Sequence, residues 1–216
     1  GELKEWKDAI PILFSTNGKQ TKVRTYWTRR TFSFCVEVQE EKLQGYEVQT
    51  QGKYPDAIQV AICANQSKAP GSLEDPASRF EFLMLASDDG SKGLCFQLAK
   101  PGMKLAHLQK KQALAPLLYE AATIAVSRGN GVTIYECSLP FRQMRRSIRP
   151  TEGRTFYLSF LVHDPDGTGI RNLGEAAGLW SSQRSTLGWS SWQGVQWENT
   201  PPFTSRLHWG FCSSKH

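Results

Sequence analysis

The sequence predicts an all-β fold, a β-sandwich of two antiparallel sheets, on three observations. Apolar and polar residues alternate with period two in many segments, which is the pattern of a half-buried strand. These segments are rich in aromatic and β-branched residues, which strands favour. No long helical pattern runs without interruption, and a sandwich of 216 residues is commonly one domain. We therefore expect a single domain over residues 1–216.

The segment 31–39, TFSFCVEVQ, is the clearest strand. Phe32, Phe34 and Val36 fall on one face and Ser33 on the other, because side chains alternate across a strand. The same test predicts strands over 21–27, 56–64, 79–87, 93–99, 132–139, 154–163 and 206–212. Eight strands are enough for two sheets.

A ninth strand is expected over 121–127. Gly129, Asn130 and Gly131 follow it, and these residue types accept the positive φ that tight hairpin turns require. The two strands on either side of this turn therefore form a hairpin.

Helix is expected only in short pieces. Residues 99–118 contain good helix formers, but Pro116 interrupts them, so we expect a loop or a short helix there. Pro140 is well placed to begin one helical turn. The other long loops are expected over 65–78 and 164–205, and loops of this length are usually functional or held by other parts of the molecule.

Composition and charge argue against several function classes. Hydrophobic residues make up 39% of the chain and charged residues 21%, and no apolar run reaches the length of about eighteen residues that a membrane helix needs. The net charge of +6 comes from scattered lysines and arginines with one short basic run at 141–149, so we expect neither a nucleic-acid nor a membrane partner. The five cysteines form no C-x-x-C pair, so we expect no zinc site.

Residues 180–197, WSSQRSTLGWSSWQGVQW, contain four of the seven tryptophans of the chain. Tryptophan has a large apolar ring system and one N–H that needs a hydrogen-bond partner. It is therefore enriched where one edge of the ring packs against apolar groups and the other edge contacts water or polar groups. That combination fits a core, an interface or a sugar site. The serines between the tryptophans argue against a dense core.

Four segments, taken in order, resemble carbohydrate-binding module family 9. They are TFSFCVEVQEEKL, GKYPDAIQVAI, VTIYECSLPF and GRTFYLSFLVHDPDGTGIRNLG. The family has an extended strand, an aromatic-x-Asp-x-hydrophobic strand, a Tyr-Glu-x-x-(Ile/Leu)-Pro-aromatic segment, and a run that ends in Asp-x-Asp. The resemblance spans about residues 20–212.

The resemblance implies a jelly-roll-like sandwich that binds a carbohydrate and performs no chemistry. Such modules are accessories of polysaccharide-degrading enzymes. The expected partners are therefore a poly- or oligosaccharide and the catalytic domain of a parent protein. We expect an extracellular or periplasmic location, although the first residues show no secretory signal pattern.

The resemblance also implies a sugar held between two aromatic side chains. The first position is Tyr54, where the family commonly has tryptophan, and the second is Trp192, in a Trp-x-Gly element similar to the family's C-terminal pattern. The loop is longer than the pattern requires, so Trp180 and Trp189 are alternatives. The polar candidates for contacts with sugar hydroxyls are Asp56, Arg79 and Glu81.

Asp164 and Asp166, in HDPDGTG, are spaced so that two carboxylates could converge on Ca²⁺, a hard cation that prefers oxygen ligands. No glutamate completes an EF-hand loop. The resemblance implies structural calcium, which makes Ca²⁺ the expected cofactor. An Asx-type turn is the alternative explanation of the motif.

Three alternative functions stay open. A glycoside hydrolase or lyase would need a pair of carboxylates, and no motif singles out a pair among the candidates Glu136, Glu152, Asp164 and Asp166. A haem-binding electron-transfer sandwich would use Met84 and His163 as ligands. A binder of acidic or sulfated glycans would use the basic residues, and its binding would weaken as salt rises.

Overall fold

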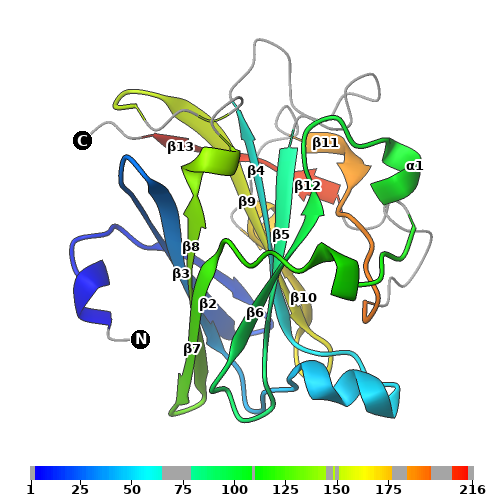
Figure 1. The fold of residues 1–216 in the computed structure, drawn as a ribbon. Helices are drawn as coiled ribbons and strands as arrows, with labels where there is room; N and C mark the ends of the chain where they lie inside the picture. The colour runs from blue at the N-terminus through cyan, green and yellow to red at the C-terminus, as the bar shows by residue number, and fades with distance from the viewer. Residues whose placement is uncertain are drawn as a thin grey trace.

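The structure is a computed structural model, and it describes residues 3–64, 79–108, 110–144, 148, 151–176, 184–195 and 206–213. Two antiparallel sheets pack face to face, which confirms the predicted all-β sandwich (Figure 1). The first sheet has the order β1 (Ile12–Thr16), β2 (Lys19–Trp27), β3 (Thr31–Gln39), β8 (Val132–Pro140) and β7 (Thr123–Gly129).

The second sheet is larger. It has the order β10 (Gly169–Asn172), β9 (Thr155–Asp164), β4 (Ala57–Ala64), β5 (Arg79–Ala86) and β6 (Gly93–Ala99), and β13 (Gly210–Ser213) also pairs with β9. A separate ladder joins β11 (Arg184–Gly188) to β12 (Arg206–His208). The helices are all short: η1 (Leu3–Trp6), η2 (Tyr46–Gln51), α1 (Leu105–Leu108), η3 (Ala115–Leu117), η4 (Phe141–Gln143) and α2 (Leu173–Ala176). Among the described residues, none of these helices has the length or apolar character to span a bilayer.

Most predicted strands are confirmed to within two residues at each end. The segment predicted as one strand over 206–212 is instead divided, because β12 and β13 pair with different strands on either side of Trp209. Three strands were not expected, since β10 and β11 lie in the segment predicted as a long loop and β1 lies before the first predicted strand. The expected short helices after residue 99 and after Pro140 are present.

Two Asn-Gly turns close the hairpins of the first sheet. Asn130 and Gly131 have φ of 52° and 72° between β7 and β8, which confirms the predicted turn. Asn17 and Gly18 have φ of 50° and 79° between β1 and β2. Positive φ at both central residues matches the twist of the flanking strands, and asparagine and glycine reach it at low cost.

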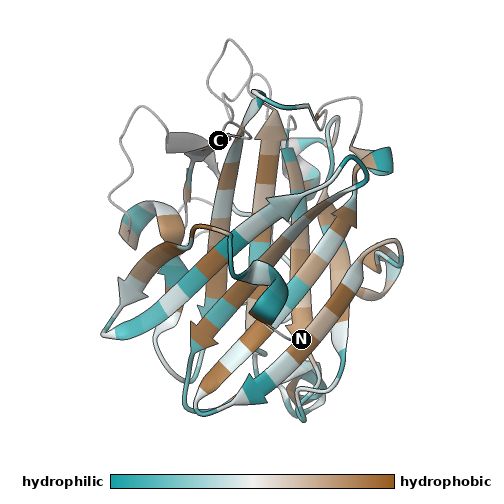
Figure 2. Cartoon of the chain, turned by 90° about the vertical axis from the view of Figure 1, so that its left-hand side faces the viewer, coloured by the Kyte–Doolittle hydropathy of each residue, from teal (hydrophilic) through white to brown (hydrophobic). Residues whose placement is uncertain are grey.

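The main core lies between the two sheets. Phe34 on β3 is fully buried and meets Phe160 on β9 edge to face, with ring centroids 5.5 Å apart. Val60 and Met84 add to the same cluster from β4 and β5. Figure 2 shows the alternating apolar and polar bands along the strands of the first sheet that produce this one-sided burial.

A second core covers the other face of the second sheet. Leu83 and Leu161 point to this face and pack with Trp189, Trp192 and Trp209. Figure 1 shows β11, β12 and α1 on this side of the sheet, away from the first sheet. As a result every residue of β5 is buried, which is the state of a strand covered on both faces.

We expect Phe34→Ala to lower the free energy of unfolding by about 3–5 kcal/mol, because it leaves a cavity where the sheets meet. Tyr26→Ala is the matched control, since Tyr26 is 56% exposed on β2, and it should change stability by less than about 0.5 kcal/mol. Denaturant unfolding followed by circular dichroism measures both. Equal losses in the two variants would contradict this placement of the core.

Candidate functional site

A row of buried polar side chains crosses the outer face of the second sheet. Glu81 on β5 is fully buried, and its carboxylate accepts hydrogen bonds from Arg79 Nε, from Gln59 Nε2 at 2.8 Å, and from the backbone N–H of Ser190 at 3.0 Å. Arg79 donates to the carbonyl of Gly188 at 2.9 Å, and Gln59 Nε2 is 3.2 Å from the carbonyl of Ser190. We call Gln59, Arg79 and Glu81 the clamp, because they hold the backbone of 188–190 against the sheet.

The electrostatics of the clamp are internally balanced. A buried charge is costly unless it is paired and hydrogen-bonded, and the Arg79 guanidinium supplies both to Glu81. Gln59 Oε1 continues the row to His163 Nε2, 3.0 Å away. Burial lowers the pKa of His163 to about 3, so this imidazole is neutral at ordinary pH.

The covering segment 188–195 is also tied to the chain after α1. Ser191 N donates to the carbonyl of Leu108 at 3.0 Å, and Gln193 N donates to the carbonyl of Gln112 at 2.7 Å. The segment is therefore held on two sides, by the clamp below and by residues 108–112 beside it.

The tryptophans of this segment point inward. Trp189 and Trp192 are both 0% exposed, and the Trp192 ring meets His163 edge to face at 5.4 Å. Ser190 and Ser191 are fully buried as well, so the expectation that the serines keep this loop from packing densely is wrong. Trp180, the third aromatic candidate, lies outside the described residues.

The buried layer has more polar groups than its protein contacts use. Within the described residues, the indole N–H groups of Trp189 and Trp192 and the hydroxyls of Ser159, Ser190 and Ser191 have no hydrogen-bond partner in the protein. Buried polar groups normally have a partner. These five groups are therefore exceptions to the usual pairing of buried polar groups.

The predicted sugar contacts divide into two groups. Arg79 and Glu81 come together with Trp189 and Trp192, but the two charged side chains bind the covering segment, and the indoles have no exposed face. Their direct contact with a sugar stays a prediction that requires this segment to move. Tyr54 lies apart in sequence from this layer, half-buried in the connection between η2 and β4.

Asp56 belongs to a different cluster. Oxygen atoms of Glu40, Asp56 and Asp164 lie within 4.8 Å of one another, and these side chains are 3%, 1% and 2% exposed. Burial raises the pKa of Glu40 to about 7 and that of Asp56 to about 9. Burial alone would raise the pKa of Asp164 too, but hydrogen bonds from Thr168 and Arg171 hold it below its ordinary value.

The second predicted metal ligand, Asp166, is exposed and does not belong to this cluster. The turn that carries it is fixed by Asp164, whose Oδ2 accepts from the backbone N–H of Thr168 at 2.9 Å and from its hydroxyl at 2.7 Å. The alternative of a side-chain-stabilised turn is therefore realised, alongside the cluster.

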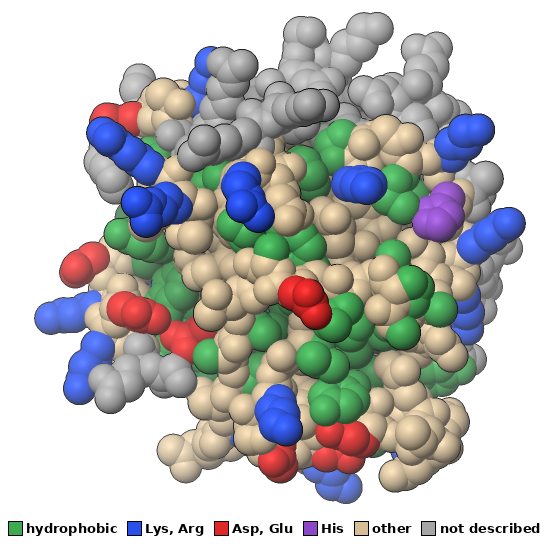
Figure 3. Space-filling model, in the orientation of Figure 1, with side chains coloured by type: hydrophobic (Ala, Val, Ile, Leu, Met, Phe, Trp, Pro, Cys, Tyr) green, Lys and Arg blue, Asp and Glu red, His purple; other side chains and the backbone are tan. Residues whose placement is uncertain are grey.

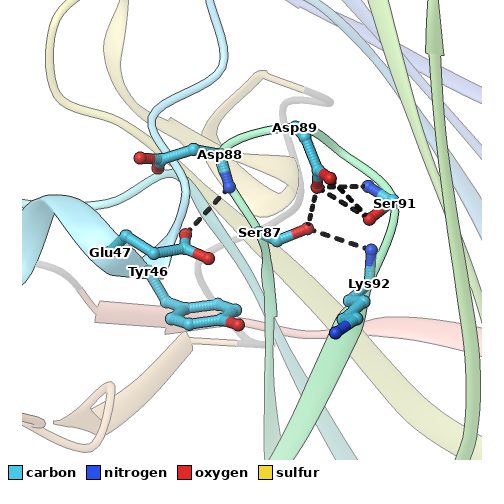
Figure 4. Close-up of a pocket in the computed structure, with 7 residues that line it drawn as sticks. All are labelled: Tyr46, Glu47, Ser87, Asp88, Asp89, Ser91 and Lys92. Atoms are coloured by element: carbon cyan, nitrogen blue, oxygen red, sulfur yellow. Dashed lines mark hydrogen bonds between the residues drawn. The ribbon is translucent and has the colours of Figure 1, made fainter.

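An open hollow lies where η2 meets the turn between β5 and β6 (Figure 4). Its volume is about 270 Å³, and it is lined by Tyr46, Glu47, Ser87, Asp88, Asp89, Ser91 and Lys92. We call it the tyrosine hollow, because the half-buried ring of Tyr46 is its one aromatic wall among these residues.

The walls of the tyrosine hollow are braced by short contacts. Glu47 accepts from the backbone N–H of Asp88 at 2.8 Å. Asp89 accepts from the hydroxyl of Ser87 at 2.5 Å and from the N–H of Ser91 at 2.9 Å, and these bonds hold its pKa near 2. A Cβ on Gly45 would lie only 2.2 Å from Asp88 N, so only glycine allows this close approach.

Sequence reasoning missed this hollow. The acidic turn at 87–92 and the glycine before Tyr46 are visible in the sequence, but nothing in either segment indicates that they touch. The two segments are about 40 residues apart, and their contact follows from the pairing of β4 with β5.

The structure also places the residues of two alternative functions, and it excludes the predicted haem ligand pair. Met84 lies in the core between the sheets, whereas His163 points to the opposite face of the second sheet, so the two cannot ligate one haem iron. Glu136 accepts from Trp6 Nε1 at 2.7 Å on the first sheet, while Asp164 ends β9 on the second sheet. Among the carboxylates considered for a glycosidase, Glu136 and Asp164 therefore belong to different sheets.

No family model matches the chain, and no curated protein matches its sequence. Solved structures do match. A family 9 carbohydrate-binding module from Caldicellulosiruptor kristjanssonii, solved with glucose, has a TM-score of 0.52 and 11% identity over 79% of this chain and 76% of that chain. The same module solved with cellotriose has a TM-score of 0.52 and 11% identity over 80% and 75% of the two chains.

The chain therefore has the fold of a family 9 carbohydrate-binding module. A third solved structure is that of a Bacteroides uniformis ATCC 8492 protein for which carbohydrate binding has been suggested. It aligns with 95% of this chain and 85% of its own length, with a TM-score of 0.50 and 11% identity. This likeness confirms the expected sandwich type and leaves the site to be argued from the residues of this chain.

We expect the stability of this family 9-like sandwich to fall with acidification partly through His163. Its folded pKa, about 3, is below its ordinary value of 6.5, so between these pH values the unfolded chain binds a proton that the folded chain does not. This group then lowers the free energy of unfolding by at most about 1.4 kcal/mol per pH unit. Above pH 6.5, His163 does not contribute to the change of the free energy of unfolding with pH.

His163→Gln removes this titration and keeps an amide within reach of Gln59. Unfolding of both proteins in denaturant, followed from pH 7 to pH 4, should give curves that converge as the pH falls. Curves that stay parallel over this range would show that His163 is protonated equally in both states.

Proposed function

We propose that this protein binds a neutral carbohydrate and leaves it chemically unchanged. The observation that carries the proposal is the fold, which is shared over about four fifths of the chain with modules solved in complex with glucose and cellotriose. The part of the chain that the structure describes supports this role with one open hollow that has an aromatic wall and several hydrogen-bonding side chains.

The tyrosine hollow is the proposed sugar site. A pyranose ring has an apolar face of C–H groups, which can cover an aromatic ring, and hydroxyls at its edge, which carboxylates accept well. Tyr46 offers the ring, and Glu47 offers a carboxylate on the side toward Asp88 (Figure 4). At about 270 Å³ the hollow is slightly smaller than the usual range of ligand pockets, which begins at about 300 Å³, so it suits one sugar unit.

The charge of the hollow favours a neutral sugar. Glu47, Asp88 and Asp89 are acidic, and Lys92 is the one basic side chain among the residues that line it. A uronate or sulfated glycan would be repelled by this balance, although the whole chain carries +6 and Figure 3 shows lysine and arginine side chains scattered over one face of the molecule. The hollow therefore argues against the acidic-glycan alternative.

Stacking on Trp192 or Trp189 is the second candidate location. It would require residues 188–195 to leave the sheet and break the contacts of the clamp. In our proposal these tryptophans instead support the scaffold, and Tyr54 is a candidate contact from the stretch between β3 and β4 that also includes Tyr46.

A glycan array identifies the ligand, and calorimetric titration then compares variants. Tyr46→Ala should weaken binding by about 10–100-fold, because one stacked ring contributes on the order of 1–3 kcal/mol. Tyr26→Ala, the exposed tyrosine of β2, is the matched control and should bind as the unchanged protein does. Loss of binding in Tyr54→Ala with full binding in Tyr46→Ala would move the site away from the hollow.

One further readout separates the neutral-sugar proposal from the acidic-glycan alternative. Affinity should change little when ionic strength rises from about 0.1 M to about 1 M, where the screening length falls from about 10 Å to about 3 Å. A steep loss would instead indicate an acidic glycan.

We also propose that the protein serves as the non-catalytic partner of a polysaccharide-degrading enzyme outside the cytoplasm. This follows from the family resemblance, since accessory modules of this kind hold an enzyme on its substrate. The protein alone should be retained by the polysaccharide it binds and should release no reducing ends from it. Release of reducing ends would make it an enzyme.

A further inference from the structure

The two sheets come together along one side of the sandwich. There β6 is the edge strand of the second sheet and β7 the edge strand of the first, and Figure 1 shows them side by side. A Cβ on Gly93 of β6 would lie 2.7 Å from Ile124 Cγ1 of β7, so the two strands approach closely at this point. Ile124 in turn pairs with Cys137 on β8. The approach therefore brings β6 close to Cys137.

Cys95 meets Cys137 at this approach. It lies two positions after Gly93, on the same face of β6, because side chains alternate along a strand. Both cysteines belong to the core between the sheets, where Cys95 is 3% exposed and Cys137 is 2% exposed. A side-chain hydrogen bond with Cys95, and then burial, raises the pKa of Cys137 well above its ordinary value. Two thiols from different sheets are thus in contact.

The chain before β7 closes over the same pair. Tyr119 donates its backbone N–H to the carbonyl of Cys95 at 2.8 Å, and its side chain is buried. Burial, and then the neighbouring thiols of Cys95 and Cys137, raise the pKa of Tyr119 to about 12. One phenol ring therefore lies beside both cysteines.

The other three cysteines lie away from this pair. Cys35 is on the outer face of the first sheet, opposite the core-facing Phe34, and Cys63 belongs to the second core, on the outer face of the second sheet. Cys212 is on β13, where its Sγ lies 3.9 Å from Thr25 Oγ1. Because β13 pairs with β9, the strands β9, β4 and β5 separate it from β6, a distance of about 19 Å at the usual strand spacing. The fold therefore selects one pairing among the five cysteines.

We propose that Cys95 and Cys137 form a disulfide bond that joins the two sheets. In the structure both residues are thiols. As their sulfur atoms bond, the two thiols give up two electrons and two protons. A disulfide such as oxidised glutathione takes up both electrons and both protons, and its own S–S bond breaks to give two thiols.

The bond would form before the sheets close. Thiol–disulfide exchange needs a thiolate that can reach the attacking partner, and both cysteines are buried in the folded protein. Its formation in the cell rests on the proposed location outside the cytoplasm, since disulfides persist in oxidising compartments. Once formed, it would fix the start of β6, three positions after Lys92 of the tyrosine hollow. The bond would thus tie a wall of the proposed sugar site to the first sheet.

The test refolds the full chain with and without an oxidant. The protein is unfolded and reduced, and it is then diluted into buffer that contains either oxidised or reduced glutathione. After refolding with the oxidant it should lose two hydrogen atoms in mass and keep three of its five thiols, and a protease digest should link the peptides that contain Cys95 and Cys137. Because the bond closes a loop of about 40 residues, the midpoint of thermal unfolding should rise by about 5–15 °C.

Matched variants assign this shift. Cys137→Ala removes one partner, so its thermal midpoint should be the same after refolding in either buffer. Cys63→Ala removes a buried cysteine from the outer face of the second sheet and should keep the full difference between the buffers. Each variant is compared with itself, so a general loss of stability does not affect the comparison.

Two results would overturn the proposal. One is an unchanged protein that keeps all five thiols after refolding with oxidised glutathione. The other is a linked pair of peptides that does not join Cys95 to Cys137. Both results come from the unchanged protein, so they stay decisive even if Cys137→Ala fails to fold. Neither involves a glycan, so failure of the proposed sugar site would leave this proposal standing.

Discussion

One buried carboxylate, that of Glu81, keeps the larger sheet covered on both faces. It joins Arg79 and Gln59 of the sheet to the backbone N–H of Ser190 in the covering segment. A sandwich sheet usually leaves its outer face to solvent. Here that face is dry, so its apolar residues add to the buried area, and the tryptophans that cover it lose the exposed faces that a sugar would need.

The sequence predicts the strands and turns better than it predicts the candidate sugar site, for a physical reason. Alternation in 31–39 and the Asn130-Gly131 turn are local signals, and both are confirmed. The Asn17-Gly18 turn carries the same signal, but the strand before it is short. The burial of Arg79 and Glu81 depends on contacts with residues more than 100 positions later in the chain. The alternating pattern of their own strand cannot show that such residues will cover its polar face.

The remaining features gather at one end of the second sheet. The start of β4, the end of β5 and the end of β9 lie together by register, since Ala57 faces both Leu85 and His163. Asp56 and Asp164 extend from this end into the acidic cluster, and the turn after β5 extends into the tyrosine hollow. The buried acidic cluster and the proposed sugar site thus lie at the same end of the second sheet.

Amide hydrogen exchange at Ser190 tests the central role of Glu81 most directly. In the unchanged protein this N–H should be strongly protected, because its acceptor is a buried carboxylate. Glu81→Gln keeps the shape but removes the charge, and a hydrogen bond to a charged group contributes about 1.5–3 kcal/mol, so exchange at Ser190 should become about 10–100-fold faster. Unprotected exchange before the substitution, or an unchanged rate after it, would contradict the account.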